Sequence, residues 1–407
     1  MKVLQINATY GYGSTGLIVR DIGDALEKNG DEAYFAYQSC LTPPDNGYRV
    51  GSGMDRKWHA LLCRLTGMQG YFSKRATKRL IRHIAEVRPD VVHLHNLHSN
   101  YIHLNTLLSY LAKEDIATVV TLHDCWFFTG KCFHYADVGC TRFQTGCGRC
   151  PKKKAPPKSL FFDPSMRVLR DRRRFFSAVP RVTLVGCSRW ICDEARKGCL
   201  SELPLEHVYN GVDTTVFAPK DTAAEREVYG LSEDTYVILG MANKWLLPVN
   251  RALLLRMAES LDEKTKLLLV GCSEQDASCL KEISDHIVPV GFIRDREMLA
   301  RHYALASVFV NVTQVDTLPT VNMESICCGT PVITYDGSGS GELVLEGCGE
   351  VVAKNDVQGL LAAIARRPEK LGEEALSRAR EIFDKDACYR MYLDVYKKAR
   401  KERKEKA

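Results

Sequence analysis

The chain has 407 residues, of which 45% are hydrophobic and 26% are charged, and it contains 29 Gly, 15 Pro and 16 Cys. This composition is typical of an ordinary globular protein and excludes fibrous, disordered and small disulfide-scaffold classes. No apolar run approaches the roughly 18 residues of a membrane span, and the first residues lack a signal-peptide core. We therefore expect a cytoplasmic protein of two domains with reduced thiols.

The charge is divided unevenly along the chain. Residues 1–205 hold 30 Lys and Arg against 18 Asp and Glu, a net charge of +12, whereas residues 206–407 hold 26 against 32, a net charge of −6. The basic half indicates a surface task that is confined to one domain. No nucleic-acid recognition module is visible, so we expect no nucleic-acid partner.

Strand-like apolar runs alternate with segments of helical periodicity in both halves. In the first half the runs lie at residues 2–8, 32–38, 90–97, 117–124 and 182–188. In the second half they lie at residues 235–242, 266–271, 286–293, 307–313 and 331–336. Such a series predicts two α/β domains, each built on a parallel sheet, that are joined near residues 206–222.

A glycine loop, GYGSTG at residues 11–16, follows the first strand. It is a poor dinucleotide fingerprint, because three residues separate it from the strand and the next strand does not end in an acid. The backbone amides of Ser14, Thr15 and Gly16, after the flexible Gly13, instead favour binding of another phosphate at a helix start. The alternative is a tight turn in which Ser14 or Thr15 caps the helix.

Five stretches occur in an order and spacing that point to one family: VVHLHN, VVTLHDCWFFTGKC, VGCSRW, VYNGVDTTVFAP and DTLPTVNMESICCGTPVIT. Together they resemble the retaining glycosyltransferases of family four, which have the GT-B fold, and most of all the bacterial enzymes of capsule, colanic-acid-type or O-antigen assembly. The resemblance implies two Rossmann-like domains that face a cleft. Residues 1–205 would bind the acceptor, with a C-terminal helix at 383–407 packing back on them, and residues 206–382 would bind the nucleotide sugar.

The resemblance places the paired acids of the family at Asp316 and Glu324. Glu324 would accept hydrogen bonds from the ribose hydroxyls, and Asp316 would bind the transferring sugar and stabilise its developing positive charge. His123, at the end of a strand, would be the cleft histidine that contacts the sugar. Further donor contacts would come from Thr317, Leu318, Pro319 and Thr320. Unrelated acids near a helix start and a structural histidine are the alternatives.

The chain departs from the family where a Lys-Gly pair should bind the diphosphate, because Val249-Asn250 stands there. Lys244 would take the role of the family's arginine, and Arg251 would replace the missing lysine. If neither reaches the phosphates, the chain would be a catalytically weak or inactive nucleotide-sugar-binding homologue. A GT-B sugar-nucleotide epimerase is a further alternative.

From the resemblance we expect a hexosyltransferase that uses a nucleotide diphosphate sugar, UDP in preference to GDP. The acceptor would be a lipid-linked cell-envelope polysaccharide or oligosaccharide. No separate nucleophile is visible, so the leaving phosphate is expected to take the acceptor's proton, without a cofactor or divalent metal. The literal DxD, Asp384 to Asp386, opens the last helix and is assigned to capping.

Four cysteines, Cys132, Cys140, Cys147 and Cys150, follow His123 in a C-x7-C-x6-C-x2-C array. Four thiolates that end in a CxxC pair could hold a structural zinc ion; unligated thiols and disulfides are the alternatives. The alternating His93 and His95 are expected to pack inside the protein rather than bind metal.

Residues 56–85 contain eight Lys and Arg and no acid. A helix at 74–87 would set Lys74, Lys78 and Arg82 along one line. With Trp58 nearby, this face could dock on an anionic membrane surface, which would make the protein peripheral on the inner face of the membrane. A plain solvated helix face is the alternative.

Overall fold

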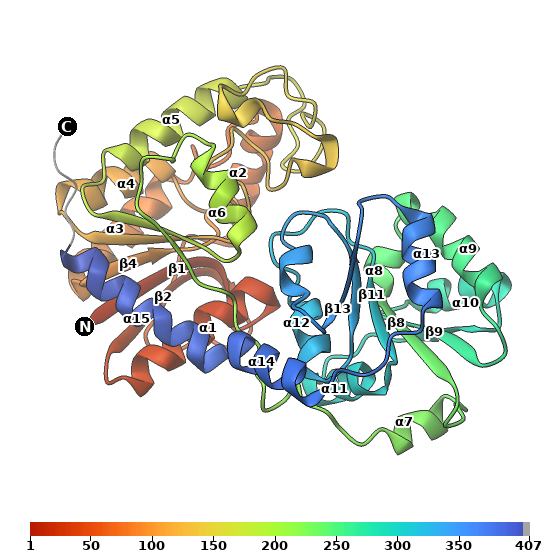
Figure 1. Ribbon diagram of the computed structural model, residues 1–407. Coiled ribbons are helices and arrows are strands. Elements are labelled where there is room, and N and C mark those ends of the chain that lie inside the picture. The colour runs from red at the N-terminus through yellow and green to blue at the C-terminus, as the bar shows by residue number, and fades with distance from the viewer. Residues whose placement is uncertain (402–407) are drawn as a thin grey trace. The chain divides into compact units, whose positions relative to one another are not determined.

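The computed structural model describes residues 1–401 (Figure 1). The chain forms two compact units, Met1–Asn210 with the segment from Cys388 onward, and Gly211–Ala387. The chain therefore enters the second unit five residues after the predicted limit of 205, and it returns at 388 rather than 383. Residues 402–407, which the predicted C-terminal segment includes, lie outside the described part.

The first unit is built on a seven-stranded parallel sheet of order β3-β2-β1-β4-β5-β6-β7. Its strands are β1 Lys2–Tyr10, β2 Glu32–Cys40, β3 Gly47–Arg49, β4 Val91–Leu94, β5 Ala117–Leu122, β6 Val182–Gly186 and β7 Leu205–His207. Its main helices are α1 Gly13–Lys28, α2 Gly53–Thr66, α3 Lys74–Val87, α4 Leu104–Lys113, α5 Ser165–Ser177 and α6 Arg189–Arg196. The strand order reverses between β1 and β4, and ligands of such sheets bind at the carboxyl ends of the strands beside this point.

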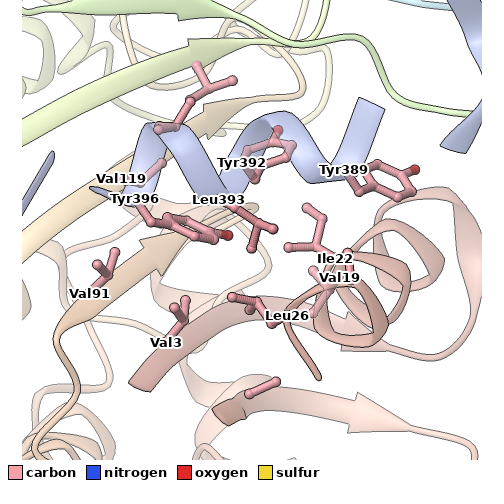
Figure 2. Packing of buried hydrophobic residues seen from close by; sticks show 14 of the residues in the cluster. Val3, Val19, Ile22, Leu26, Val91, Val119, Tyr389, Tyr392, Leu393 and Tyr396 are labelled. Carbon is pink, nitrogen blue, oxygen red and sulfur yellow. The ribbon is translucent and has the colours of Figure 1, made fainter. Parts of the chain in front are cut away.

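The C-terminal helix α15, Lys385–Lys401, completes the core of this unit (Figure 2). Its buried side chains Tyr389, Tyr392, Leu393 and Tyr396 pack against Val3, Val19, Ile22 and Leu26 of β1 and α1. The phenols also find polar partners, because Tyr396 Oη lies 2.7 Å from His93 Nδ1 and Tyr392 Oη lies 3.0 Å from Thr121 Oγ1. Because their hydroxyl groups are hydrogen-bonded, these tyrosines bury apolar surface without leaving a polar group unpaired. Helix α15 is therefore an integral part of the first unit.

The second unit is built on a six-stranded parallel sheet of order β10-β9-β8-β11-β12-β13. Its strands are β8 Tyr236–Met241, β9 Thr265–Val270, β10 Ile287–Val290, β11 Val308–Asn311, β12 Val332–Tyr335 and β13 Gly349–Val352. Its helices are α7 Ala223–Val228, α8 Ala242–Trp245, α9 Arg251–Ser260, α10 Glu274–Ile283, α11 Arg296–Leu305, α12 Thr320–Cys327, α13 Val357–Ala365 and α14 Glu373–Phe383. Here the order reverses between β8 and β11, which defines a second sheet edge suited to a ligand.

A tryptophan anchors the end of the short helix α8, which follows β8. Trp245 is fully buried and donates its indole N–H to the carbonyl oxygen of Val310 at 3.1 Å. A Cβ atom on Gly240 would lie 2.2 Å from the Trp245 nitrogen, so glycine is required at that position of β8.

The predicted fold class of two parallel-sheet α/β domains is confirmed. The assignment of the DxD to capping is also confirmed, because Asp384 Oδ1 accepts from the Ala387 N–H at 2.9 Å at the start of α15. In the described part of the chain, every helix is too short or too polar to serve as a membrane span.

Candidate active site

The glycine loop leaves the start of α1 uncapped. The residue before the helix is Tyr12, whose side chain makes no capping hydrogen bond, so the interpretation of Ser14 or Thr15 as the cap is wrong. Gly11 and Gly13 have φ angles of +72° and +66°, which only glycine adopts readily. The loop therefore presents first-turn amides that lack a side-chain partner, as an anion-binding helix start requires.

His123 follows β5 at the same edge of the first sheet and belongs to a chain of hydrogen bonds. Its Nε2 lies 3.0 Å from His95 Nδ1, and His95 Nε2 lies 3.1 Å from Gln5 Oε1. The Gln5 amide nitrogen in turn donates to the Val19 carbonyl at 3.0 Å. The His123 ring is thus linked by hydrogen bonds to the end of β4, to β1 and to α1.

This chain assigns the tautomer of each ring. Because the Gln5 nitrogen donates to a carbonyl, its oxygen faces His95, and an amide oxygen only accepts. His95 therefore carries its proton on Nε2, and its bare Nδ1 accepts from His123 Nε2. A neutral His123 consequently keeps Nδ1 unprotonated, as an acceptor for a hydrogen bond from a ligand.

The electrostatics favour the neutral form. Burial lowers the pKa of His123 to about 4, with Asp124 acting in the opposite direction and His98 adding to the decrease. Burial also holds the pKa of His95 well below its ordinary value, and the nearby His93 and His123 lower it further. At neutral pH we therefore treat both rings as uncharged.

The other histidines of this edge are structural partners. His93 is buried between Tyr396 and Thr121, with both ring nitrogens 2.7 Å from a hydroxyl oxygen, so the prediction of packing is confirmed. His98 Nε2 lies 2.9 Å from Asp124 Oδ2. Burial raises the pKa of Asp124, but His98, the Trp126 N–H and His134 together lower it by more, so the net pKa is below its ordinary value and the carboxylate is charged.

In the second unit, Asp316 lies in the loop after β11 and Glu324 lies on α12. Asp316 Oδ1 accepts from the Leu318 N–H at 3.2 Å, and its carbonyl accepts from the Gly339 N–H at 2.9 Å. Glu324 Oε2 accepts from the Tyr303 hydroxyl at 3.1 Å. Burial raises the pKa of Glu324 above its ordinary value, and Tyr303 and Arg296 act in the opposite direction.

Polar atoms without partners gather beside Asp316. Asp316 forms a bridge with Ser338, which brings the loops after β11 and β12 together. Within residues 1–401, four buried side-chain oxygens of these two loops have no hydrogen-bond partner: Gln314 Oε1, Thr317 Oγ1, Ser338 Oγ and Ser340 Oγ. Unsatisfied buried polar atoms are rare in native proteins, and a cluster of them at a sheet edge indicates a place for a polar ligand.

The departure at Val249-Asn250 has a structural explanation. Asn250 is buried, and its amide nitrogen donates to the carbonyls of Lys244 at 2.9 Å and Val312 at 3.3 Å, which joins the loops after β8 and β11. Val249 is 65% exposed. Lys244 lies on the short helix α8 that follows β8, Arg251 opens α9, and neither forms an ion pair within the described residues. Both cations therefore remain free to bind an anion.

The four predicted zinc ligands line one small cavity of about 20 Å³. Cys132 hydrogen-bonds Cys150, and Cys147 Sγ accepts from the Gly130 N–H at 3.3 Å. Across residues 1–401, however, no group of three or more His, Cys, Asp or Glu could hold a metal ion in the arrangement seen. The structure thus brings the cysteines together as free thiols, and the zinc site stays a prediction.

Solved structures share this two-unit architecture. Sucrose-phosphate synthase from Thermosynechococcus elongatus superposes with a TM-score of 0.68 at 17% identity, over 98% of each chain. Anabaena Alr3699/HepE, in complex with UDP, superposes with a TM-score of 0.65 at 15% identity, over 98% of this chain and all of that one. The fold is that of the GT-B class of enzymes.

Two family models identify the chain more closely. Residues 16–216 match Glycosyltransferase Family 4, and residues 239–367 match Glycosyl transferases group 1. Together these matches take in more than three quarters of the chain. The protein therefore belongs to the group 1 and family 4 glycosyltransferases, as the sequence motifs predict.

Curated relatives agree with this assignment. WcaC of Escherichia coli (strain K12), named as a colanic acid biosynthesis glycosyl transferase, is 25% identical over 281 residues, 66% of this chain and 65% of that protein. The GDP-mannose-dependent alpha-(1-6)-phosphatidylinositol monomannoside mannosyltransferase of Mycolicibacterium smegmatis is 31% identical over 39% of this chain and 46% of that protein. The matches thus span less than two thirds of the length of these relatives.

Proposed function

We propose that the protein is a retaining hexosyltransferase that takes its sugar from a nucleotide diphosphate sugar. The proposal rests on the cluster of unpartnered polar oxygens around Asp316, together with the unpaired cation of Lys244, whose backbone Asn250 joins to the loop after β11. In this proposal the hydroxyl groups of the sugar hydrogen-bond to these oxygens, and the negative charge of the diphosphate pairs with the Lys244 cation. UDP is favoured as the base-bearing part, because solved neighbours of this fold are described in complex with UDP and UDP-glucose.

In the proposed reaction, the bond between the sugar's C1 and the diphosphate oxygen breaks as the acceptor oxygen bonds to C1 on the same face. Because the new bond forms on the face that the diphosphate leaves, the anomeric configuration is kept. The acceptor's proton passes to the leaving phosphate, which balances the charge. Asp316 stabilises the positive charge that develops on the sugar ring, and Lys244 and Arg251 stabilise the leaving diphosphate. His123 Nδ1 accepts a hydrogen bond from a sugar hydroxyl.

For the acceptor we propose a lipid-linked glycan of the cell envelope, on which the protein acts at the inner face of the membrane. The names of WcaC and of the mycobacterial mannosyltransferase, one a polysaccharide enzyme and the other a lipid-directed one, support this class. A role in capsule or related polysaccharide biosynthesis would follow.

The test is a thermal-shift screen with UDP and GDP sugars, followed by a measurement of nucleotide release with and without an acceptor. We expect a raised melting temperature with UDP sugars and slow release of UDP without acceptor. Binding without any release across a donor and acceptor panel would instead identify an inactive homologue. A sugar-nucleotide product formed without acceptor would identify an epimerase, and no binding to either base would overturn the proposal.

A further inference from the structure

A large basic cavity lies in the first unit, beside His98. Its volume is about 700 Å³, and one wall is the face of α2 that carries Arg56, Lys57 and Arg64. Lys158 closes another wall. The lining, drawn from the described part of the chain, contains no carboxylate, so four cations face one space of ligand size.

These cations lack internal partners. None of the four side chains forms an ion pair within residues 1–401, although the basic residues elsewhere often do, as Arg79 does with Asp55 at 3.3 Å. Like charges around one cavity repel one another unless an anion neutralises them. A phosphate-bearing ligand with more than one negative charge is the complementary occupant.

The cavity reaches the candidate active site of the same unit. His98 lines it, and the His98 ring pairs with Asp124, the residue next to His123. A ligand that fills the cavity therefore ends close to the carboxyl edge of the first sheet, where His123 offers its free nitrogen. An acceptor held in this cavity would thus lie near the His123 nitrogen to which the proposed function assigns a sugar hydroxyl.

Exposed apolar side chains flank the cavity. Met54, Trp58 and Leu61 recur along α2 at helical spacing, and Trp58 is 59% exposed beside Lys57. Phe161 and Phe162 are 66% and 64% exposed, and their segment is joined to the end of α2 because the Leu160 N–H donates to the Arg64 carbonyl at 2.8 Å. Exposed aromatic side chains on two joined segments that also carry cations are typical of a surface that meets lipid.

We propose that this cavity binds the diphosphate of a lipid-linked acceptor, while the exposed aromatic residues contact its apolar tail and the surrounding bilayer. The proposal rests on the proposed glycosyl transfer, whose acceptor it specifies. It assigns membrane contact to the cavity on α2 and the segment 158–162 rather than to the cationic line of α3.

The test compares two triple variants of equal charge in vesicle co-sedimentation. Arg56→Ala/Arg64→Ala/Lys158→Ala removes three cavity cations, and Lys74→Ala/Lys78→Ala/Arg82→Ala removes three exposed cations of α3. The vesicles are phosphatidylcholine with undecaprenyl diphosphate, and phosphatidylcholine with phosphatidylglycerol at matched charge. We expect the wild type to prefer the diphosphate vesicles, and the cavity variant to bind them roughly a hundredfold more weakly, since each cation near an anionic surface contributes about a factor of five.

The α3 variant should keep the preference for the diphosphate lipid, even where its binding to phosphatidylglycerol falls. Trp58→Ser/Phe161→Ser should weaken binding to both vesicles, because it removes apolar contact and no charge. Loss of the preference in the α3 variant, or its retention in the cavity variant, would overturn the proposal. UDP-sugar thermal shifts on the same samples separate the two proposals: absent shifts with an intact lipid preference would reject the transferase alone.

Discussion

The carboxyl edges of the two sheets carry titratable groups of opposite kind, and burial moves both toward the uncharged form. It lowers the pKa of His123 to about 4 and raises the pKa of Glu324. The supports differ, however. His123 is held by a relay through His95 and Gln5, whereas Glu324 accepts from the single phenol of Tyr303. The first edge thus provides a neutral hydrogen-bond acceptor held by a relay, and the second provides a carboxyl group whose charge depends on the Tyr303 phenol and on Arg296.

The largest effect is expected at the second edge, from Asp316→Asn. The substitution keeps the size and the Leu318 contact but removes the charge that stabilises the sugar, so kcat should fall by about 10²–10³. Thermal shifts with UDP sugars should change little. Asp285→Asn, an exposed acid at the amino end of β10, is the control and should behave as wild type. A fall of less than tenfold for Asp316→Asn would remove that residue from the mechanism.

The second prediction concerns the stability of the first edge. The pKa of His123 lies below the ordinary value of a histidine, so the unfolded chain takes up a proton first as the pH falls, and stability is lost between pH 6.5 and 4. His123→Asn removes this loss, so wild type should lose about 2 kcal/mol more than the variant between about pH 7 and 5. Hydrogen exchange of the β5 amides measures the difference. Equal losses in both proteins would show that His123 is not held neutral.

Much of both edges could be predicted from the sequence, because each lies at the end of a long apolar run. The three missed strands, β3, β7 and β13, are short and lie at sheet edges, so their sequences GYR, LEH and GEVV lack a continuous apolar pattern. Motifs likewise located His123 and Asp316. The partners of His123 were missed because Gln5, His95 and His123 come from three strands that are adjacent only in space. A polar Gln5 inside the buried strand KVLQINA was the one available sign.

The third prediction compares one phenol of each unit. Tyr303→Phe removes the donor that lowers the pKa of Glu324, so that pKa should rise. As the pH is lowered, Glu324 of the variant should therefore be protonated earlier, and its affinity for UDP sugars should begin to fall at a higher pH than that of the wild type. Tyr396→Phe leaves His93 with one partner fewer and should cost about 1 kcal/mol of stability without moving that pH profile. Isothermal titration across pH distinguishes the two variants. The same pH profile in both would contradict a role for Tyr303 in setting the charge of Glu324.

The smallest effect is expected where the chain departs from its family. Val249 is exposed, and its replacement by lysine adds a second cation five residues after Lys244 without removing the hydrogen bonds of Asn250. We expect a stability change within about 0.5 kcal/mol and a rise in kcat/KM of about twofold to tenfold, because a surface charge stabilises the leaving diphosphate only modestly. Asn250→Gly, which completes the family pair, should instead lower activity, since it cuts the two bonds that join the loops after β8 and β11. If Val249→Lys leaves kcat/KM unchanged, Lys244 and Arg251 already supply the positive charge that the missing pair provides in relatives, and the departure is a change of position rather than a loss.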